Sequence, residues 1–434
     1  MDKMADVLGR AGAWCGQNKY LSAIKNAFQN FMPLTIAGAI GVLWCNVLVN
    51  DQTGLGLFFK PIMALDFLNP AFQAVNFCTI SCITVGITLG IAQEIGIWNM
   101  GAEKAGYIPG LVGLAAWLSV TNTSHMVEGA KAAFTGISGN ELGATGLFTG
   151  MIIGVLSVEL FCFFEKQDAL KIKMPEQVPP GVARAFEVLV PATITLIITA
   201  CIGSACYNLT GLYLNDVIKN GIQGPLGAVG ATIPGVMIIY LVIMLFWLVG
   251  IHGNNMLSAV KEALFTPLAL ENVEKFNKGE KPTNIINMYF LQMCGEFGGS
   301  GVTIGLVIAI MIFGKREDNK AIASLSLVPG LFNINETVTF GIPMVLNPIL
   351  GIPFVVAPLI TIIIGYVLTV IGFCPVACLT VPWTTPPIVF GFLACGANVM
   401  GAVTQAILVV VSTVIYTPFL ISYEKYQNKQ AAEA

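Results

Sequence analysis

The stretch from Tyr289 to Phe313, YFLQMCGEFGGSGVTIGLVIAIMIF, decides what kind of fold this chain adopts. It is long enough to cross a bilayer, because a transmembrane helix needs about 20 mostly apolar residues. The run Gly295–Gly301 interrupts it, and this run lacks the lysine of a phosphate-binding P-loop. We therefore interpret it as a helix break that exposes backbone N–H groups, with a plain kink as the alternative.

The rest of the chain has the same apolar character. Of its 434 residues 56% are hydrophobic and only 10% are charged, whereas a soluble domain carries about 25% charged residues. The sequence therefore predicts an all-α, polytopic integral membrane protein in a lipid bilayer, with about ten transmembrane helices and some re-entrant segments. The candidate spans are Phe31–Asn50, Gln73–Ala92, Tyr107–Thr121, Leu142–Phe164, Val188–Cys206, Ile233–Ile251, Tyr289–Phe313, Thr337–Leu350, Pro353–Phe373 and Ala402–Tyr423.

Charge and cysteine content exclude several classes of function. The net charge is -3 with no basic domain, which argues against a nucleic-acid partner. Eleven cysteines occur with only two histidines, and most of the cysteines lie inside apolar runs as small buried residues. We predict neither a metal site nor a cofactor.

The clearest interior boundary is Lys166–Arg184, a basic and proline-rich stretch. Because loops rich in Lys and Arg stay in the cytoplasm, we expect this loop to be cytoplasmic. Four spans precede it, which places the N-terminus on the same side, and Lys425 and Lys429 place the C-terminus there too.

Glycines four residues apart mark two helix faces in the front part. Gly146, Gly150 and Gly154 form one row, and Gly86 and Gly90 form another. Such rows let two backbones approach closely. They predict either a scaffold or dimer surface, or packing within one subunit.

Isolated polar residues mark the rear part. Glu336 is the only charged residue between Lys320 and Glu424, and a carboxylate at membrane depth needs a partner, water or a solute. His252 ends an apolar helix beside Asn254 and Asn255.

Two further clusters are the glycine break with Glu296 and the run Val381–Pro387, which contains Trp383 and Thr384 and cannot form a regular helix. Together these clusters offer an acid, an imidazole, amides, hydroxyls and two indole rings. Sugars need this combination, because hydroxyls form hydrogen bonds and ring faces stack on aromatic side chains.

These residues occur in motifs along nearly the whole chain, and the chain resembles the lactose, cellobiose and diacetylchitobiose family of enzyme IIC permeases of the phosphotransferase system. The matching stretches are Met32–Gly38, Pro180–Pro191, Gly250–Gly253, Gly298–Gly301, Asn335–Glu336, Phe340–Pro343, Asn347–Pro348 and Pro382–Thr384.

The resemblance implies a homodimeric, multi-pass protein of the bacterial cell membrane that translocates a β-linked disaccharide and is no enzyme on its own. Residues 1–184 would form the scaffold and dimerisation domain, and residues 185–434 the sugar-binding domain with two re-entrant hairpins. A separate cytoplasmic IIB protein, phosphorylated on cysteine by an upstream IIA, would phosphorylate the sugar.

The resemblance also implies the roles of the site residues. His252 and Glu336 would orient the phosphate-acceptor hydroxyl, and neither is assigned as a base. The expected substrate-binding residues are Trp247, His252, Asn254, Asn255, Glu296, Gly298, Ser300, Asn335, Glu336, Trp383 and Thr384.

The main alternative is a secondary sugar transporter driven by protons or sodium, with Glu336 as the coupling group. Against it, no second intramembrane acid is evident near Glu336. An antiporter would also pair its carboxylates with Lys or Arg inside the spans, and the sequence shows no such pair. A membrane enzyme acting on lipid-borne sugar lacks the expected carboxylate pair or metal ligands.

Overall fold

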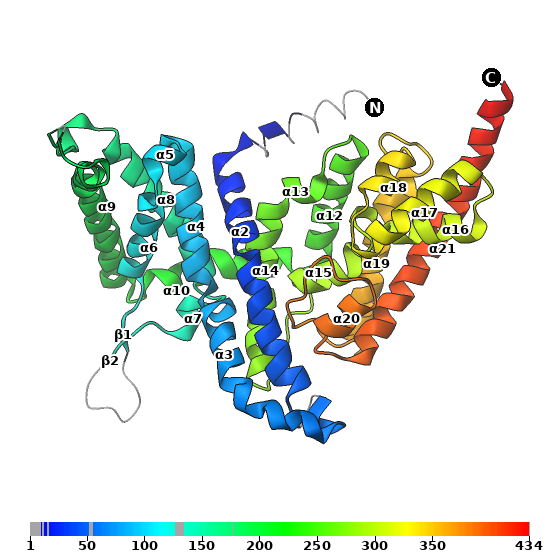
Figure 1. The fold of residues 1–434 in the computed structure, drawn as a ribbon, viewed down its shortest axis with the longest axis horizontal. Helices are drawn as coiled ribbons and strands as arrows, with labels where there is room; N and C mark the ends of the chain where they lie inside the picture. The colour runs from blue at the N-terminus through cyan, green and yellow to red at the C-terminus, as the bar shows by residue number, and fades with distance from the viewer. Residues whose placement is uncertain are drawn as a thin grey trace. The chain divides into compact units, whose positions relative to one another are not determined.

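The computed structural model describes residues 10, 13–14, 17–51, 55–125, 134–175 and 177–433. Helices account for nearly all of the regular structure in this part of the chain (Figure 1). The exception is a short antiparallel hairpin of β1 (Ser124–His125) and β2 (Phe134–Thr135). The predicted all-α membrane fold is confirmed.

Two compact units divide the chain. The front unit comprises residues 17–38 and 74–227, and the rear unit comprises the described parts of 1–16, 39–73 and 228–434. These units are defined by packing, and the expected functional division at residue 184 stays a prediction. In the front unit α9 (Pro180–Thr210) packs against α6 (Ile108–Val120) and α8 (Leu147–Glu165).

The centre of the front unit is α4 (Ile83–Met100), which packs against both α6 and α8 (Figure 1). Ala116, Trp117, Val120 and Ile153 form a buried cluster in this unit. The remaining elements include α2 (Lys19–Leu43) and α3 (Asn69–Cys78), each of which has residues in both units. The others are η4 (Ile80–Cys82), α5 (Ala102–Ala105), α7 (Gly139–Leu142), η5 (Asp168–Leu170), α10 (Leu214–Ile218), η6 (Lys219–Gln223) and α11 (Gly224–Gly230).

The glycine rows of the front unit serve packing within the chain. A Cβ atom on Gly150 would lie 2.2 Å from Oγ1 of Thr88 in α4. A Cβ atom on Gly86 would lie 2.2 Å from the ring of Phe31 in α2. Both rows are therefore occupied by neighbouring helices of the same subunit, which is the second of the two interpretations.

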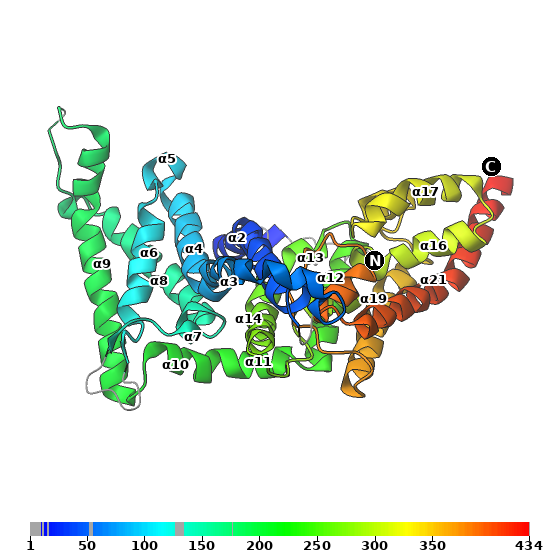
Figure 2. The ribbon, with the colours of Figure 1, turned by 60° about the horizontal axis from the view of Figure 1, so that its bottom comes forward.

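The rear unit is built around α19 (Gly351–Val370) and α21 (Val399–Glu433). The helix α21 packs along α16 (Ile304–Phe313), and α17 (Glu317–Leu331) lies on α16 (Figure 2). The other elements are η1 (Trp44–Leu48), η2 (Leu55–Leu57), η3 (Lys60–Leu68), α12 (Ile233–Leu248), α13 (Gly253–Met256), α14 (Ser258–Asn277), α15 (Met288–Gly295), η7 (Ser300–Val302), α18 (Glu336–Gly341) and α20 (Val389–Ala394).

Six helices of the described residues are long and apolar enough to cross a membrane, or seven if the bent pair Met288–Val302 and Ile304–Phe313 is one span. Two shorter apolar helices, Ile108–Val120 and Ile233–Leu248, match two further candidate spans. The candidate span Thr337–Leu350 is wrong. Its helix α18 ends at Gly341, since Pro343 and Pro348 cannot donate the N–H groups that a longer helix needs.

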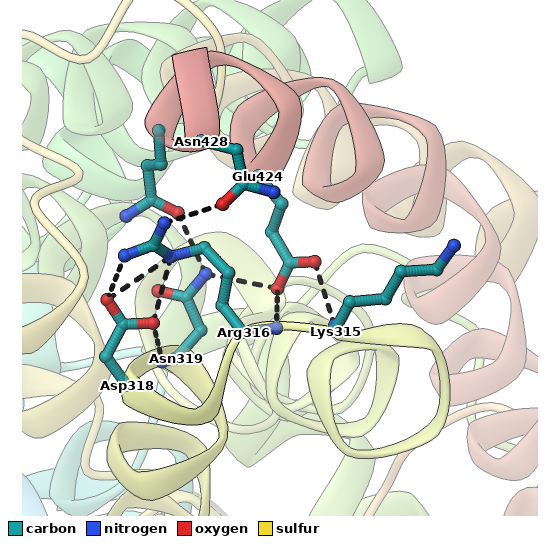
Figure 3. Close-up of polar contacts among 7 residues, drawn as sticks. Lys315, Arg316, Asp318, Asn319, Glu424 and Asn428 are labelled. Carbon is teal, nitrogen blue, oxygen red and sulfur yellow. Dashed lines mark hydrogen bonds and ion pairs between the residues drawn. The ribbon is translucent and has the colours of Figure 1, made fainter. Parts of the chain in front are cut away.

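A polar cluster joins the turn before α17 to the end of α21. The buried carboxylate of Glu424 accepts hydrogen bonds from the backbone N–H of Lys315 (2.9 Å) and Arg316 (3.3 Å) and from the side-chain amide of Asn319 (3.2 Å) (Figure 3). The guanidinium of Arg316 donates to Asp318, and this hydrogen bond lowers the pKa of that carboxyl. Glu424 thus caps the start of α17, where a negative charge is favourable.

Candidate functional site

The first part of the candidate site follows the end of α12. Gly250 has a φ of +81°, which turns the chain so that His252 begins α13. The ring of Trp247 is buried with its centroid 4.4 Å from that of His252, and it meets Phe354 edge-on at 6.4 Å. Among the described residues no acceptor pairs with the buried Nε1 of Trp247. This is unusual, because a buried indole N–H normally donates a hydrogen bond.

A backbone contact fixes the hydrogen-bonding role of His252. Its Nδ1 accepts a hydrogen bond from the backbone N–H of Asn255 at 3.2 Å, so Nδ1 carries no proton. In the neutral ring the proton is then on Nε2. This Nε2 lies 3.9 Å from Oε1 of Glu336, and the two side chains are 38% and 48% exposed. Both groups are therefore accessible and too far apart for a direct hydrogen bond.

Glu296 is the centre of a second polar group. Its Oε1 accepts from the hydroxyl of Tyr240 (2.8 Å) and from the amide of Asn254 (3.0 Å), and it forms an ion pair with Nζ of Lys261. The hydroxyl of Ser300 donates to the Asn254 Oδ1 at 3.1 Å. The side chain of Asn254 is thus held at both ends.

Sequence reasoning missed Lys261 and Tyr240. The sequence shows no carboxylate paired with Lys or Arg inside the candidate spans, and Lys261 lies outside all of them. In the structure Lys261 pairs with Glu296, and their side chains are 7% and 17% exposed. The signal available in the sequence was Lys261 itself, a charged residue close to the His252 cluster. Nothing local links it to Glu296, which is 35 residues away.

The expected helix break at Gly295–Gly301 is confirmed. The segment Met288–Val302, which contains this run, is bent by 60° relative to Ile304–Phe313. Gly298, Gly299 and Gly301 have φ values of +69°, +87° and +79°. Such values favour glycine. The expectation of exposed donors fails at two positions, since the amide of Gly298 donates to Asn333 Oδ1 and the amide of Gly299 donates to the carbonyl of Glu296.

The side chains of Asn333 and Asn335, the two asparagines before Glu336, form hydrogen bonds that hold neighbouring segments in place. Asn335 is buried, and its amide donates to the carbonyl of Ser300 (2.8 Å) and to the hydroxyl of Thr339 (3.2 Å). Asn333 donates to the backbone of the Trp383 segment. Between them they leave Glu336 at the exposed start of α18.

The remaining predicted residues lie in two places. Trp383 is 43% exposed in an irregular turn, and Thr384 is half-buried next to it. Asn255 is exposed, and its backbone rather than its side chain contacts His252. All eleven predicted residues belong to the rear unit.

The contacts bring together His252 with Glu336, Asn254 with Glu296 and Ser300, and Asn335 with Ser300. Within the described ranges no three His, Cys, Asp or Glu side chains are grouped so as to hold a metal ion. The site therefore consists of hydrogen-bonding groups and aromatic rings, next to helices of spanning length. These features define a helical membrane protein whose rear unit groups hydrogen-bonding side chains and aromatic rings.

Comparison with known proteins identifies the family. The family described as "Phosphotransferase system, EIIC" matches residues 25–358. The chain belongs to this EIIC family, whose members are the membrane transporter subunits of the phosphotransferase system. It is therefore a bacterial membrane protein and a sugar permease component rather than an enzyme on its own.

Similar proteins cover almost all of the chain. The oligo-beta-mannoside-specific EIIC component of Bacillus subtilis is 32% identical over 98% of this chain and 94% of its own length. The cellobiose-specific EIIC component of Lactococcus lactis is 29% identical, with 98% of each chain covered. The crystal structure of the transporter ChbC, the IIC component for N,N'-diacetylchitobiose, matches with a TM-score of 0.88 and 29% identity over 97% of both chains.

Proposed function

We propose that this permease carries a β-linked disaccharide, such as cellobiose or diacetylchitobiose, and presents it to a cytoplasmic IIB protein that bears a phosphocysteine. An upstream IIA protein phosphorylates IIB, and the permease works as a homodimer. The names of the similar proteins support this substrate class, since they include oligo-beta-mannoside, cellobiose and N,N'-diacetylchitobiose.

The observation that carries the proposal is the spacing of His252 and Glu336. Their facing atoms, Nε2 and Oε1, are 3.9 Å apart. One hydroxyl oxygen can lie within about 2.8 Å of both atoms, at an angle of roughly 90° between the two hydrogen bonds. A primary hydroxyl of a sugar fits this geometry, because it accepts one hydrogen bond and donates another.

The tautomer of His252 separates the roles of the two residues. Because Nδ1 accepts from the backbone, the neutral imidazole donates from Nε2 to the sugar oxygen. The carboxylate of Glu336 then accepts the hydroxyl proton. The sugar oxygen attacks the phosphorus of the IIB phosphocysteine, an O–P bond forms, the S–P bond breaks, and the cysteine leaves as a thiolate. The exposed ring of Trp383 offers an apolar face for a sugar ring. The ring of Trp247 is buried and supports the ring of His252 from behind.

Three variants at Glu336 and His252 test these roles in the purified protein. Glu336→Gln keeps the size of the side chain but loses the charge, and we expect sugar affinity to fall by roughly ten- to a hundredfold because charge-assisted hydrogen bonds are the stronger kind. Phosphorylation of bound sugar by phospho-IIB should fall further. His252→Gln keeps a hydrogen-bond donor, so the phosphorylation of bound sugar should fall less in this variant than in His252→Ala. Parental binding and phosphorylation in both Glu336→Gln and His252→Ala would remove these residues from the site.

The Lys261–Glu296 ion pair favours ion-coupled transport as the second candidate, since such transporters pair carboxylates with basic residues. Uptake into vesicles distinguishes the two mechanisms. Uptake through the phosphotransferase route requires phosphorylated IIB and yields sugar phosphate, and an uncoupler leaves it unchanged. Uptake that an uncoupler abolishes, with free sugar as the product, would establish the ion-coupled mechanism instead.

A further inference from the structure

The side chain of Asn333 joins three segments that are far apart in the sequence. Its Oδ1 accepts from the backbone N–H of Gly298 at 2.6 Å, and its Nδ2 donates to the carbonyls of Trp383 at 2.5 Å and Thr385 at 3.0 Å. Gly298 is 35 residues and Trp383 is 50 residues from Asn333. One amide thus ties the glycine break and the Trp383 turn to the segment that carries Glu336.

The backbone of Asn333 explains why asparagine suits this position. Its φ of +63° lies in the left-handed region, which asparagine adopts more readily than other residues with a side chain apart from aspartate. Glycine adopts the same conformation but has no side chain. Aspartate has the same shape but cannot donate to the two carbonyls. Only asparagine offers this backbone together with one acceptor and two donors.

The Trp383 turn depends on such a tie. It lies between Pro382 and Pro386, outside regular secondary structure, with one turn hydrogen bond from the N–H of Thr385 to the carbonyl of Pro382 at 2.9 Å. Helix or sheet hydrogen bonds therefore do not fix it. The carbonyl that Asn333 holds belongs to Trp383 itself, whose ring is 43% exposed.

We propose that Asn333 is a positioning residue of the sugar site, which sets where the Trp383 ring lies relative to the Gly298 turn and Glu336. It acts through the backbone and does not touch the sugar. This inference rests on the proposed function, in which a sugar ring stacks on Trp383.

Asn333→Gly gives the sharpest test, because it preserves the left-handed backbone and removes all three hydrogen bonds. The full chain, purified in nanodiscs and labelled with 5-fluorotryptophan, is examined by fluorine NMR, with the Trp383 resonance assigned from Trp383→Phe. We expect the Trp383 resonance to shift and broaden, the Trp117 resonance to stay unchanged, and affinity for cellobiose or diacetylchitobiose to fall at least about tenfold. Asn333→Asp should also shift the Trp383 resonance and lower the sugar affinity. It replaces the glycine variant in the test if that variant does not fold.

Asn347 provides a matched control. It also makes three hydrogen bonds, to the carbonyl of Pro343 (2.7 Å) and from the amides of Ile349 and Leu350 (both 2.9 Å), but all of them lie within one local turn. Asn347→Ala should lower the melting temperature of the folded protein without moving the Trp383 resonance or the sugar affinity.

The possible outcomes separate this inference from the proposed function. A parental Trp383 resonance in Asn333→Gly would overturn the inference, and so would a displaced Trp383 with parental affinity. An equal loss of affinity in Asn347→Ala would show that general destabilisation is the cause and would also overturn it. If the parent bound none of the disaccharides, the proposed function would fail, while the Trp383 resonance would still report whether Asn333 positions the turn.

Discussion

Lys261 shows how a single residue supports the site without belonging to the part that faces the solute. Its ammonium group pairs with Glu296, whose same oxygen also accepts from Asn254. Asn254 in turn accepts from Ser300. Lys261 therefore holds the side chain of Glu296 in place, and Glu296 orients the amide of Asn254.

Removing the ammonium group of Lys261 should destabilise the folded protein. In Lys261→Met the Glu296 carboxylate keeps only neutral partners, and removing one member of a buried ion pair costs about 3–5 kcal/mol. We expect a large fall in melting temperature together with a loss of sugar affinity. Thermal unfolding of the detergent-solubilised protein measures the first effect, and equilibrium binding of the disaccharide measures the second.

A second substitution and an exposed pair provide the controls. Adding Glu296→Gln to Lys261→Met removes the unpaired charge and should restore most of the stability. Lys278 pairs with Glu274 at 2.6 Å on an exposed surface, where such pairs contribute little. Lys278→Met should leave the melting temperature unchanged. If it lowers the melting temperature as much as Lys261→Met does, the ion pair has no special role.

At the scale of secondary structure, the cap on α17 links the C-terminal helix to the site. Glu424 of α21 accepts hydrogen bonds from Lys315 and Arg316, which directly precede α17 (Figure 3). The far end of α17 leads through Pro329 to Asn333 and Glu336. The position of the segment that carries Glu336 thus depends in part on a carboxylate at the opposite end of the helix.

Glu424→Ala should destabilise the rear unit. It leaves the backbone N–H groups of Lys315 and Arg316 without their acceptor and removes one of the two hydrogen bonds of the buried Asn319 amide, at a cost of about 1–3 kcal/mol. Thermal unfolding and hydrogen exchange of α17 measure the effect. Glu433 lies on the same helix and pairs only across an exposed surface with Lys429 at 3.8 Å. Equal effects of Glu433→Ala and Glu424→Ala would argue against the cap.

At the scale of the whole molecule, the distribution of Lys and Arg predicts which side of the membrane each loop occupies. The linker after α8 is basic, and one of its residues, Arg184, pairs with buried Glu165 at 2.9 Å. We expect this linker and both termini to be cytoplasmic. Ala169→Cys and Gln430→Cys, both at exposed positions, should resist an impermeant thiol reagent added to whole cells and react with it after lysis.

The opposite end of α9 provides the positive control. This helix begins in the linker and is of spanning length, so Leu212→Cys just beyond it should react from outside. The exposed cysteines Cys78 and Cys201 and the half-buried cysteines Cys45, Cys82 and Cys206 are first replaced by serine. Reaction of Ala169→Cys in intact cells, with protection of Leu212→Cys, would invert the orientation.

Features that depend only on residues close together in the sequence could be predicted from the sequence. Low charge and long apolar runs determine the membrane fold, because lipid accepts few charges wherever they occur. The break at Gly295–Gly301 follows from the backbone freedom of glycine. Glu336 and His252 were recognisable because each is isolated among apolar residues.

Only the tertiary structure decided the features that join distant segments. Three such features are the Lys261–Glu296 ion pair, the hydrogen bonds of the Asn333 side chain and the placement of α9 in the front unit. Each involves residues or helices that are well separated in the chain. Such contacts depend on how helices pack, and packing is set by side-chain shape across the whole unit rather than by local pattern. The sequence alone thus established the class of protein and the isolated polar residues, whereas packing decided which of them meet.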